Sequence, residues 1–187
     1  TVARLDSSDN SFPANFPFQT LFLGPSHGEY CYKRGLPSAN KELVSDYDVV
    51  VVEGIWQYHS FATWRALRTS KVPYFVYTHG MLDPWFKRTY PLKHLKKWLY
   101  WPWADYRVLR DAEAVLFTTE QERQLSSKSF WLYNANEKVM GYGTSDPPSD
   151  IERQRSIFLQ SFSNLRGKRF FLFLSRIHPK KGLDILI

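Results

Sequence analysis

The segment PYFVYTHG, Pro73–Gly80, decides the predicted fold of this chain. Its first six residues form a largely apolar run of strand length, and a His-Gly pair ends the run. A continuous apolar run is typical of a strand buried on both faces, as in a parallel sheet covered by helices. Other runs of this kind, three strong and two weak, are Asp48–Val52 (DVVVV), Ala114–Thr118 (AVLFT), Arg169–Leu174 (RFFLFL), Thr20–Leu23 and Val139–Tyr142.

Helices are predicted between these runs. Residues 58–69 carry apolar side chains at helical spacing, and a leucine stripe over residues 92–99 stops before Pro102. Two pairs have the spacing of capping boxes that start helices: Thr119 with Glu122, and Ser149 with Glu152. Strand and helix in alternation predict an α/β fold with a doubly wound parallel sheet flanked by helices.

The positive charge of the chain is concentrated in two places. The 187 residues have a net charge of +7; residues 85–110 hold seven Lys or Arg against Asp105 alone, and residues 165–187 hold six against Asp184 alone. Two such patches differ from the diffuse positive field of a general nucleic-acid binder, so nucleic acid is not an expected partner. No signal peptide or run of 18 apolar residues is visible, and the single Cys31 fits a reducing compartment, so a cytoplasmic location is expected.

Ligands of doubly wound sheets bind beyond the carboxyl ends of the strands, which draws attention to His79. Gly80 follows it and lets backbone approach a ligand closely. An imidazole there can donate to a ligand hydroxyl or stabilise charge on a phosphate, although a purely structural histidine is the alternative. Glu120, at the start of the helix after the next strand, is a further candidate for ligand contact, whereas Glu122 is explained by capping.

The loop after Glu53 faces the same predicted cleft. Trp56 and His59 lie in this loop and could line a ligand-binding site, with simple packing of Trp56 as the alternative. No metal or cofactor is expected, because the histidines are scattered and the chain lacks HxxxH, paired-cysteine and DxD spacings.

The tail RFFLFLSRIHPKKGLDILI, Arg169–Ile187, has the layout of an anion-binding turn. A strand feeding a glycine turn and a helix start presents unpaired backbone N–H groups to a phosphate. Arg176 and Lys181 lie around this turn and suit a diphosphate, the alternative being a solvated basic loop.

The segment WFKRTYPLKHLKKWLYWPW, Trp85–Trp103, mixes aromatic rings with cations. On a helix Lys93, Lys96 and Lys97 would lie opposite a stripe of leucines, Leu92, Leu95 and Leu99. This pattern fits a helix lying on an anionic bilayer, and it also fits a surface helix docked on the sheet by its leucines.

Two of these segments carry a resemblance to a known family. The tail resembles the strand, basic turn and helix that open the second domain of family 4 (group 1) retaining glycosyltransferases of the GT-B fold. Pro73–Glu122 is similar to the later part of their first domain, where a His-Gly pair ends one strand and a TTE-type turn ends the next. With Gly54–Arg68, the likeness covers most of Asp46–Ile187.

The resemblance implies a Rossmann-like N-terminal, acceptor-side domain over residues 1–145 that lacks its first strand. Residues 146–187 would be a linker and the beginning of the C-terminal donor-binding domain, so the fold is expected to be truncated at both ends. The implied reaction transfers a hexose from a nucleoside-diphosphate sugar to a saccharide or lipid-linked acceptor with retention, in polysaccharide biosynthesis and without a metal. His79 would lie beside the transferred sugar, and Arg176 with Lys181 would neutralise the leaving diphosphate.

The family grips its donor with a pair of glutamates in the second domain, and this sequence ends before any counterpart, so the isolated chain is expected to be inactive. The rival interpretation is a non-catalytic module that binds sugar or anionic lipid. Peripheral contact with the inner face of an anionic membrane would also suit an enzyme that acts on a lipid-linked acceptor.

Overall fold

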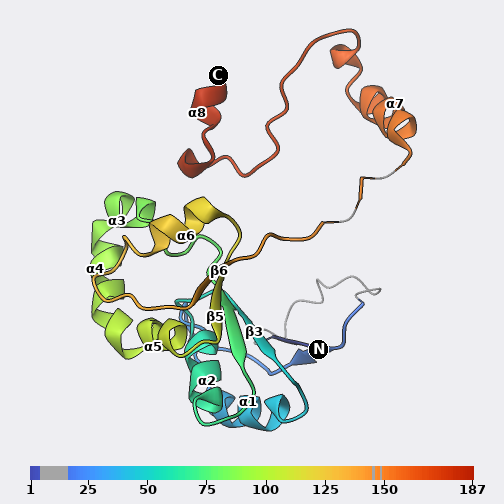
Figure 1. Ribbon diagram of the computed structural model, residues 1–187. Coiled ribbons are helices and arrows are strands. Elements are labelled where there is room, and N and C mark those ends of the chain that lie inside the picture. Colours follow the sequence, from blue (N-terminus) through green and yellow to red (C-terminus); the bar gives the residue numbers. More distant parts are fainter. Residues whose placement is uncertain (5–16, 145, 148) are drawn as a thin grey trace. The chain divides into compact units, whose positions relative to one another are not determined.

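The computed structural model describes residues 1–4, 17–144, 146–147 and 149–187. The chain divides into two compact units, Thr1–Tyr142 and Gly143–Ile187. The larger unit contains a four-stranded parallel sheet in the order β3 (Val50–Glu53), β4 (Tyr74–Tyr77), β5 (Ala114–Phe117) and β6 (Glu137–Val139) (Figure 1). The predicted α/β class with a parallel sheet is therefore confirmed.

Six helices of the larger unit accompany these strands: α1 (Leu36–Val44), α2 (Tyr58–Leu67), α3 (Trp85–Thr89), α4 (Pro91–Tyr100), α5 (Asp105–Arg110) and α6 (Glu120–Ser126). Local signals set their ends. Pro91 is the first residue of α4, where its missing N–H and fixed φ are no disadvantage. The Thr119 hydroxyl accepts a hydrogen bond of 3.1 Å from the Glu122 N–H and caps α6, as predicted.

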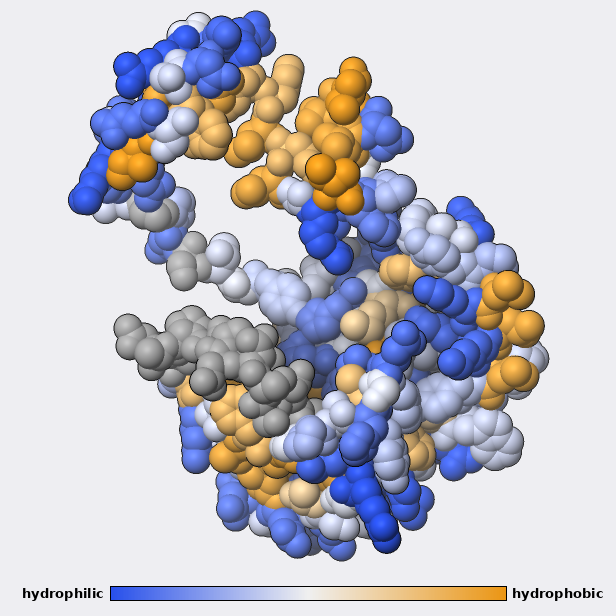
Figure 2. Space-filling model, turned by 180° about the vertical axis from the view of Figure 1, so that it is seen from behind, coloured by the Kyte–Doolittle hydropathy of each residue, from blue (hydrophilic) through white to orange (hydrophobic). Residues whose placement is uncertain are grey.

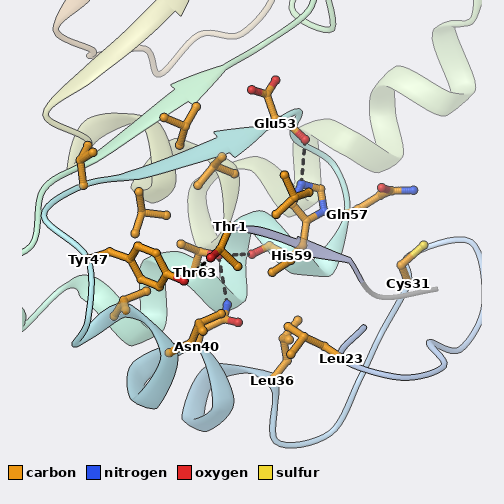
Figure 3. Close-up of a pocket in the computed structure, with 18 of the residues that line it drawn as sticks. Thr1, Leu23, Cys31, Leu36, Asn40, Tyr47, Glu53, Gln57, His59 and Thr63 are labelled. Carbon is orange, nitrogen blue, oxygen red and sulfur yellow. Dashed lines mark hydrogen bonds between the residues drawn. The ribbon is translucent and has the colours of Figure 1, made fainter. Parts of the chain in front are cut away.

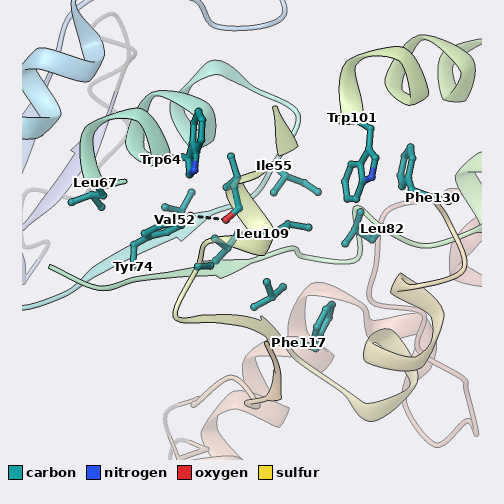
Figure 4. Packing of buried hydrophobic residues seen from close by; sticks show 14 of the residues in the cluster. Val52, Ile55, Trp64, Leu67, Tyr74, Leu82, Trp101, Leu109, Phe117 and Phe130 are labelled. Atoms are coloured by element: carbon teal, nitrogen blue, oxygen red, sulfur yellow. Dashed lines mark hydrogen bonds between the residues drawn. The ribbon is translucent and has the colours of Figure 1, made fainter. Parts of the chain in front are cut away.

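The core lies between the sheet and the helices α2 and α5. Val52 and Tyr74 of the strands belong to the same buried cluster as Trp64 of α2 and Leu109 of α5 (Figure 4). β5 is buried along its whole length, which explains its continuous apolar sequence. At one end of the core, Trp101 stacks on Phe130 with ring centroids 4.3 Å apart.

A short strand at the beginning of the chain was not predicted. β1 (Val2–Arg4) pairs in parallel with β2 (Thr20–Phe22), and the two form a separate sheet. β2 matches the weak apolar run at Thr20–Leu23, whereas three residues of β1 are too few to give a periodic signal.

The smaller unit corrects two predictions. It contains α7 (Ile151–Ser161) and α8 (Leu183–Leu186), but the predicted strand Arg169–Leu174 is irregular. A strand needs hydrogen bonds from a neighbour, and the described residues of this unit contain no other strand. The start of α7 is also not capped by Ser149; the Asp150 carboxylate accepts from the Arg153 N–H instead.

The leucine stripe of α4 points to solvent. The exposed fractions of Leu92, Leu95 and Leu99 are 82%, 55% and 62%, whereas α2 buries most of its residues. Orange side chains over α4 lie beside blue ones at the edge of the molecule (Figure 2). Docking of α4 on the sheet through its leucines, one of the two predicted arrangements, is therefore wrong. Among the helices of the described residues, none combines the length and apolar composition needed to span a bilayer.

Candidate functional site

The carboxyl ends of β3 and β4 lie side by side, because the register pairs Glu53 with Tyr77. The chain turns sharply just beyond both ends. Non-glycine residues with positive φ are uncommon and cluster at functional sites. Two of the residues in these turns are of this kind and two are glycines: Trp56 (φ 73°), His79 (φ 51°), Gly54 (φ 87°) and Gly80 (φ 70°).

His79 joins two polar side chains that are far away in the sequence. Its Nε2 lies 2.5 Å from Oε2 of Glu53, and its Nδ1 lies 2.6 Å from the Tyr142 hydroxyl. With a neutral ring, Nε2–H donates to the carboxylate and Nδ1 accepts from the phenol. The side chain of His79 is 30% exposed and that of Glu53 is 60% exposed, so a polar ligand can reach both.

Aromatic packing supports this cluster. The Tyr77 ring stacks on both His79 and Tyr142, at centroid distances of 5.7 and 5.3 Å. Burial raises the pKa of Tyr142, and the nearby Glu53, Tyr77 and Glu122 raise it further. Tyr142 therefore keeps its proton near neutral pH and acts as a hydrogen-bond donor. Sequence analysis missed Tyr142, because no local pattern links it to a histidine 63 residues earlier.

Glu122 does more than take part in the cap at the start of α6. Its Oε1 accepts from the Gly80 N–H (2.6 Å) and the Thr78 hydroxyl (2.9 Å). Its Oε2 accepts from the N–H and the hydroxyl of Thr118, at 2.9 and 2.7 Å. Burial alone would raise the pKa of Glu122, but these hydrogen bonds outweigh it and lower the pKa below the usual value.

Glu120, the candidate for ligand contact on α6, makes contacts on its own helix. Its carboxylate accepts from Arg123 at 2.5 and 2.9 Å and from Gln124 at 2.9 Å. The hydrogen bonds from Arg123 and Gln124 lower the pKa of Glu120 to about 2. The side chain is 55% exposed.

Trp56 packs into the core while its backbone turns beside the site. Its ring lies 5.2 Å from Phe130 and 5.7 Å from Trp101, and its Nε1–H donates to the Met81 carbonyl at 3.3 Å. The Nζ atom of Lys97 lies 4.3 Å from the centroid of the same ring. The ring contacts of Trp56 are therefore those of a packing residue, the alternative that sequence analysis gave for it.

Asp105, a residue that sequence analysis did not select, hydrogen-bonds the backbone of the turn at Trp56. Its Oδ1 accepts from the Trp56 N–H (3.4 Å) and the Ser60 hydroxyl (3.3 Å), and its fully buried Oδ2 has no hydrogen-bond partner among the described residues. Burial raises the pKa of Asp105 to about 7, while the hydrogen bonds from Trp56 and Ser60 and the charge of Lys97 limit the rise.

His59 lines a cavity of about 820 Å³ in the larger unit (Figure 3). Its Nε2 lies 3.0 Å from the Glu53 carbonyl oxygen. Burial lowers the pKa of His59, although hydrogen bonds to the Glu53 and Gly54 backbone oppose this effect, so the ring is neutral near pH 7. Polar side chains of Glu53, Gln57 and His59 meet apolar ones of β3 and α1 around the cavity.

Arg176 and Lys181 belong to the smaller unit, where both are exposed. Lys181 ends a 3₁₀ turn, Pro179–Lys181, and Gly182 follows it with φ 66° before α8 begins. The predicted glycine turn and helix start are therefore present. The His178 ring caps the turn, since its Nδ1 accepts from the Lys180 N–H at 3.2 Å.

The three lysines of α4 do not share one surface. Lys93 and Lys96 are exposed, whereas Lys97 is half-buried over Trp56. Burial lowers the pKa of Lys97, Asp105 opposes this effect, and Lys93 adds to it. The described residues contain no group of three or more His, Cys, Asp or Glu side chains that could hold a metal ion.

Among the comparisons with known proteins, the family model is the one that supports this architecture. A search of curated proteins and a search of solved structures each found no match to the chain. The model of a family described as a glycosyl transferase 4-like domain matches residues 34–143, which are more than half of the chain and include β3 to β6. The parallel sheet and its helices are consistent with a Rossmann-like half of a GT-B fold. The chain therefore belongs to the glycosyl transferase 4-like domain family.

Proposed function

We propose that this glycosyltransferase domain is the acceptor side of a retaining hexosyltransferase that uses a nucleoside-diphosphate sugar and a saccharide or lipid-linked acceptor in polysaccharide biosynthesis. The observation that carries the proposal is the array of Glu53, His79 and Tyr142 at the carboxyl edge of the sheet. A carboxylate and a phenol that each hydrogen-bond the same imidazole, and that are partly open to solvent, suit the several hydroxyls of a hexose.

The expected chemistry needs no protein nucleophile. The bond from the anomeric carbon to the diphosphate breaks, the acceptor oxygen bonds to that carbon on the same face, and the departing diphosphate takes the acceptor's proton. Arg176 and Lys181 would stabilise the negative charge that develops on the diphosphate, and no metal would be required. His79 would orient the transferred sugar by exchanging its hydrogen bond with Glu53 or Tyr142 for one with a sugar hydroxyl.

The sugar site is tested with His79→Asn, because asparagine tolerates the left-handed backbone at this position. Methyl glycosides of common hexoses are titrated into the labelled chain, and chemical shifts of residues around β3 and β4 are followed by NMR. We expect the chemical shifts of Gly80 and Tyr142 to change in the natural protein. The affinity derived from these changes should be at least tenfold weaker in the variant. Equal responses in both proteins contradict the proposal.

The diphosphate site is tested by titrating UDP and GDP into the chain and into Arg176→Gln/Lys181→Gln. The control, Arg166→Gln/Lys168→Gln, removes the same charge from exposed positions of the same unit. Binding should weaken at least tenfold in the first variant and little in the control. An equal loss in both would mean that only net charge attracts the nucleotides.

A specific observation favours a second candidate function, binding of an anionic lipid surface at the inner face of the membrane. Leu92, Leu95 and Leu99 are exposed along α4, and the exposed Trp98 and Trp131 rings lie 5.9 Å apart beside them. Such apolar side chains enter the acyl boundary of a bilayer, while Lys93 and Lys96 attract anionic headgroups. This contact would bring the domain to a lipid-linked acceptor.

Vesicle co-sedimentation separates lipid binding from other uses of this face. Vesicles with phosphatidylglycerol should bind the chain, and pure phosphatidylcholine should bind it far less. Leu92→Ser/Leu95→Ser/Leu99→Ser should abolish binding, whereas Leu172→Ser/Leu174→Ser, a control that changes exposed leucines of the other unit, should not. If the triple variant instead only removes self-association seen by light scattering, the face is a contact between copies and the lipid proposal fails.

A further inference from the structure

Glu122 is the point where two turns of the sheet edge meet. Each carboxylate oxygen accepts two hydrogen bonds: Oε1 from the turn after β4, and Oε2 from the turn after β5. The residues that donate, Thr78 with Gly80 and Thr118, are 44, 42 and 4 residues away in the chain. All these donors point at one side chain, which leaves it no free lone-pair direction for a ligand.

The two donors on the β4 side flank His79. The Thr78 hydroxyl binds Oε1 from one side of this residue and the Gly80 N–H binds it from the other. Between them His79 has φ 51°, a conformation that a histidine adopts only where its surroundings hold it. Since backbone conformation limits which side-chain rotamers are open, the same clamp limits the direction of the imidazole.

We propose that Glu122 is a positioning residue, which holds the turn Thr78–Gly80 so that the His79 ring meets Glu53 and Tyr142. Glu122 does not touch the ligand; it acts through His79. The role of Glu122 in sugar transfer rests on the function proposed above, whereas its role in orienting the imidazole does not. Glu120, two residues earlier on α6, serves as a matched acidic residue whose contacts stay on its own helix.

The experiment compares the natural chain with Glu122→Gln and Glu120→Gln. An amide nitrogen cannot accept hydrogen bonds, so Glu122→Gln leaves two of the four donors without a partner. We expect hydrogen exchange of the Gly80 or Thr118 amide to accelerate at least tenfold. We also expect the ¹⁵N shifts of the His79 ring to move from a single tautomer, protonated at Nε2, toward a mixture. Glu120→Gln should leave both signals unchanged.

These signals need no substrate, so they separate failure of this proposal from failure of the transferase function. If the amides lose protection while the His79 ring signals stay unchanged, Glu122 supports the fold alone and the proposal is overturned. If Glu122→Gln does not fold, Thr78→Val replaces it, because valine has the shape of threonine and removes one donor. The ring signals should then move in the same direction by a smaller amount, and an unchanged ring overturns the proposal.

Discussion

α2 and α4 are both ten residues long and belong to the same unit, yet they use their apolar side chains in opposite ways. α2 turns Trp64 and Leu67 into the core. α4 turns its leucines outward and places His94 and Lys97 on the protein side, where the His94 ring stacks on Phe130 and the Lys97 ammonium lies over Trp56. An apolar stripe thus identifies an amphipathic helix but not the surface that the stripe meets.

The largest effect is expected when one apolar side chain of each helix is replaced and the free energy of unfolding is compared. Trp64→Ala removes a ring that stacks on Phe61 and donates to Asp111 at 2.8 Å, and we expect it to lower the free energy of unfolding by about 3–5 kcal/mol. Leu95→Ala on α4 should change it by about 0.5 kcal/mol or less. Urea titration followed by circular dichroism measures both. A similar loss in the two variants would show that the α4 leucines are buried in solution.

A second test uses Asp105, which lies between the two helices. Its pKa is raised from 3.8 to about 7, so between these values the folded state holds a proton that the unfolded state has released. Stability therefore falls as pH rises through this window and levels off above pH 7. Asp105→Asn lacks this titration, and its stability relative to the natural chain should increase by about 1–3 kcal/mol from pH 4 to pH 8. A constant difference across this range would mean that the carboxyl is solvated.

The smallest expected effect concerns the inward lysine of α4. Lys97→Met removes the cation that limits the rise of the Asp105 pKa, so the pH at which stability levels off should move upward by roughly half a unit. Lys96→Met, on the exposed side, should leave that pH unchanged. Each lysine variant is compared with the double variant that also carries Asp105→Asn, and the difference between their free energies of unfolding is measured at several pH values. If the two lysine variants behave alike, Lys97 does not face Asp105.

The features visible in the sequence are those set by near neighbours. The apolar runs at 48–52, 73–78 and 114–118 predict β3, β4 and β5, although only β5 is buried on both faces along its whole length. The run Arg169–Leu174 is also apolar but has no partner strand among the described residues, so apolar composition alone did not make it a strand. The side of α4 that faces the protein could not be predicted either. The periodicity of the sequence shows that the helix has an apolar stripe, but not whether this stripe faces the protein or the solvent.

The candidate site was predictable only in part. His79 and Gly80 could be selected because a His-Gly pair ends a buried strand. The partners of His79 could not, because Glu53 reaches it through the register of two strands, and Tyr142 through the course of the chain beyond β6. The capping pattern already explained Glu122, so nothing in the sequence indicated the hydrogen bond between its carboxylate and the distant Gly80 N–H.

The order of the strands has a practical consequence. β3 stands at one border of the four-stranded sheet, where Val49 just before it and Val51 within it line the cavity of the larger unit and are each close to half exposed. A border strand rich in valine, without proline or lysine, is a template onto which another extended chain can add. Concentrated samples should therefore aggregate through this border strand at temperatures below the thermal unfolding of the domain. Val51→Lys is the first substitution to test for preventing this aggregation.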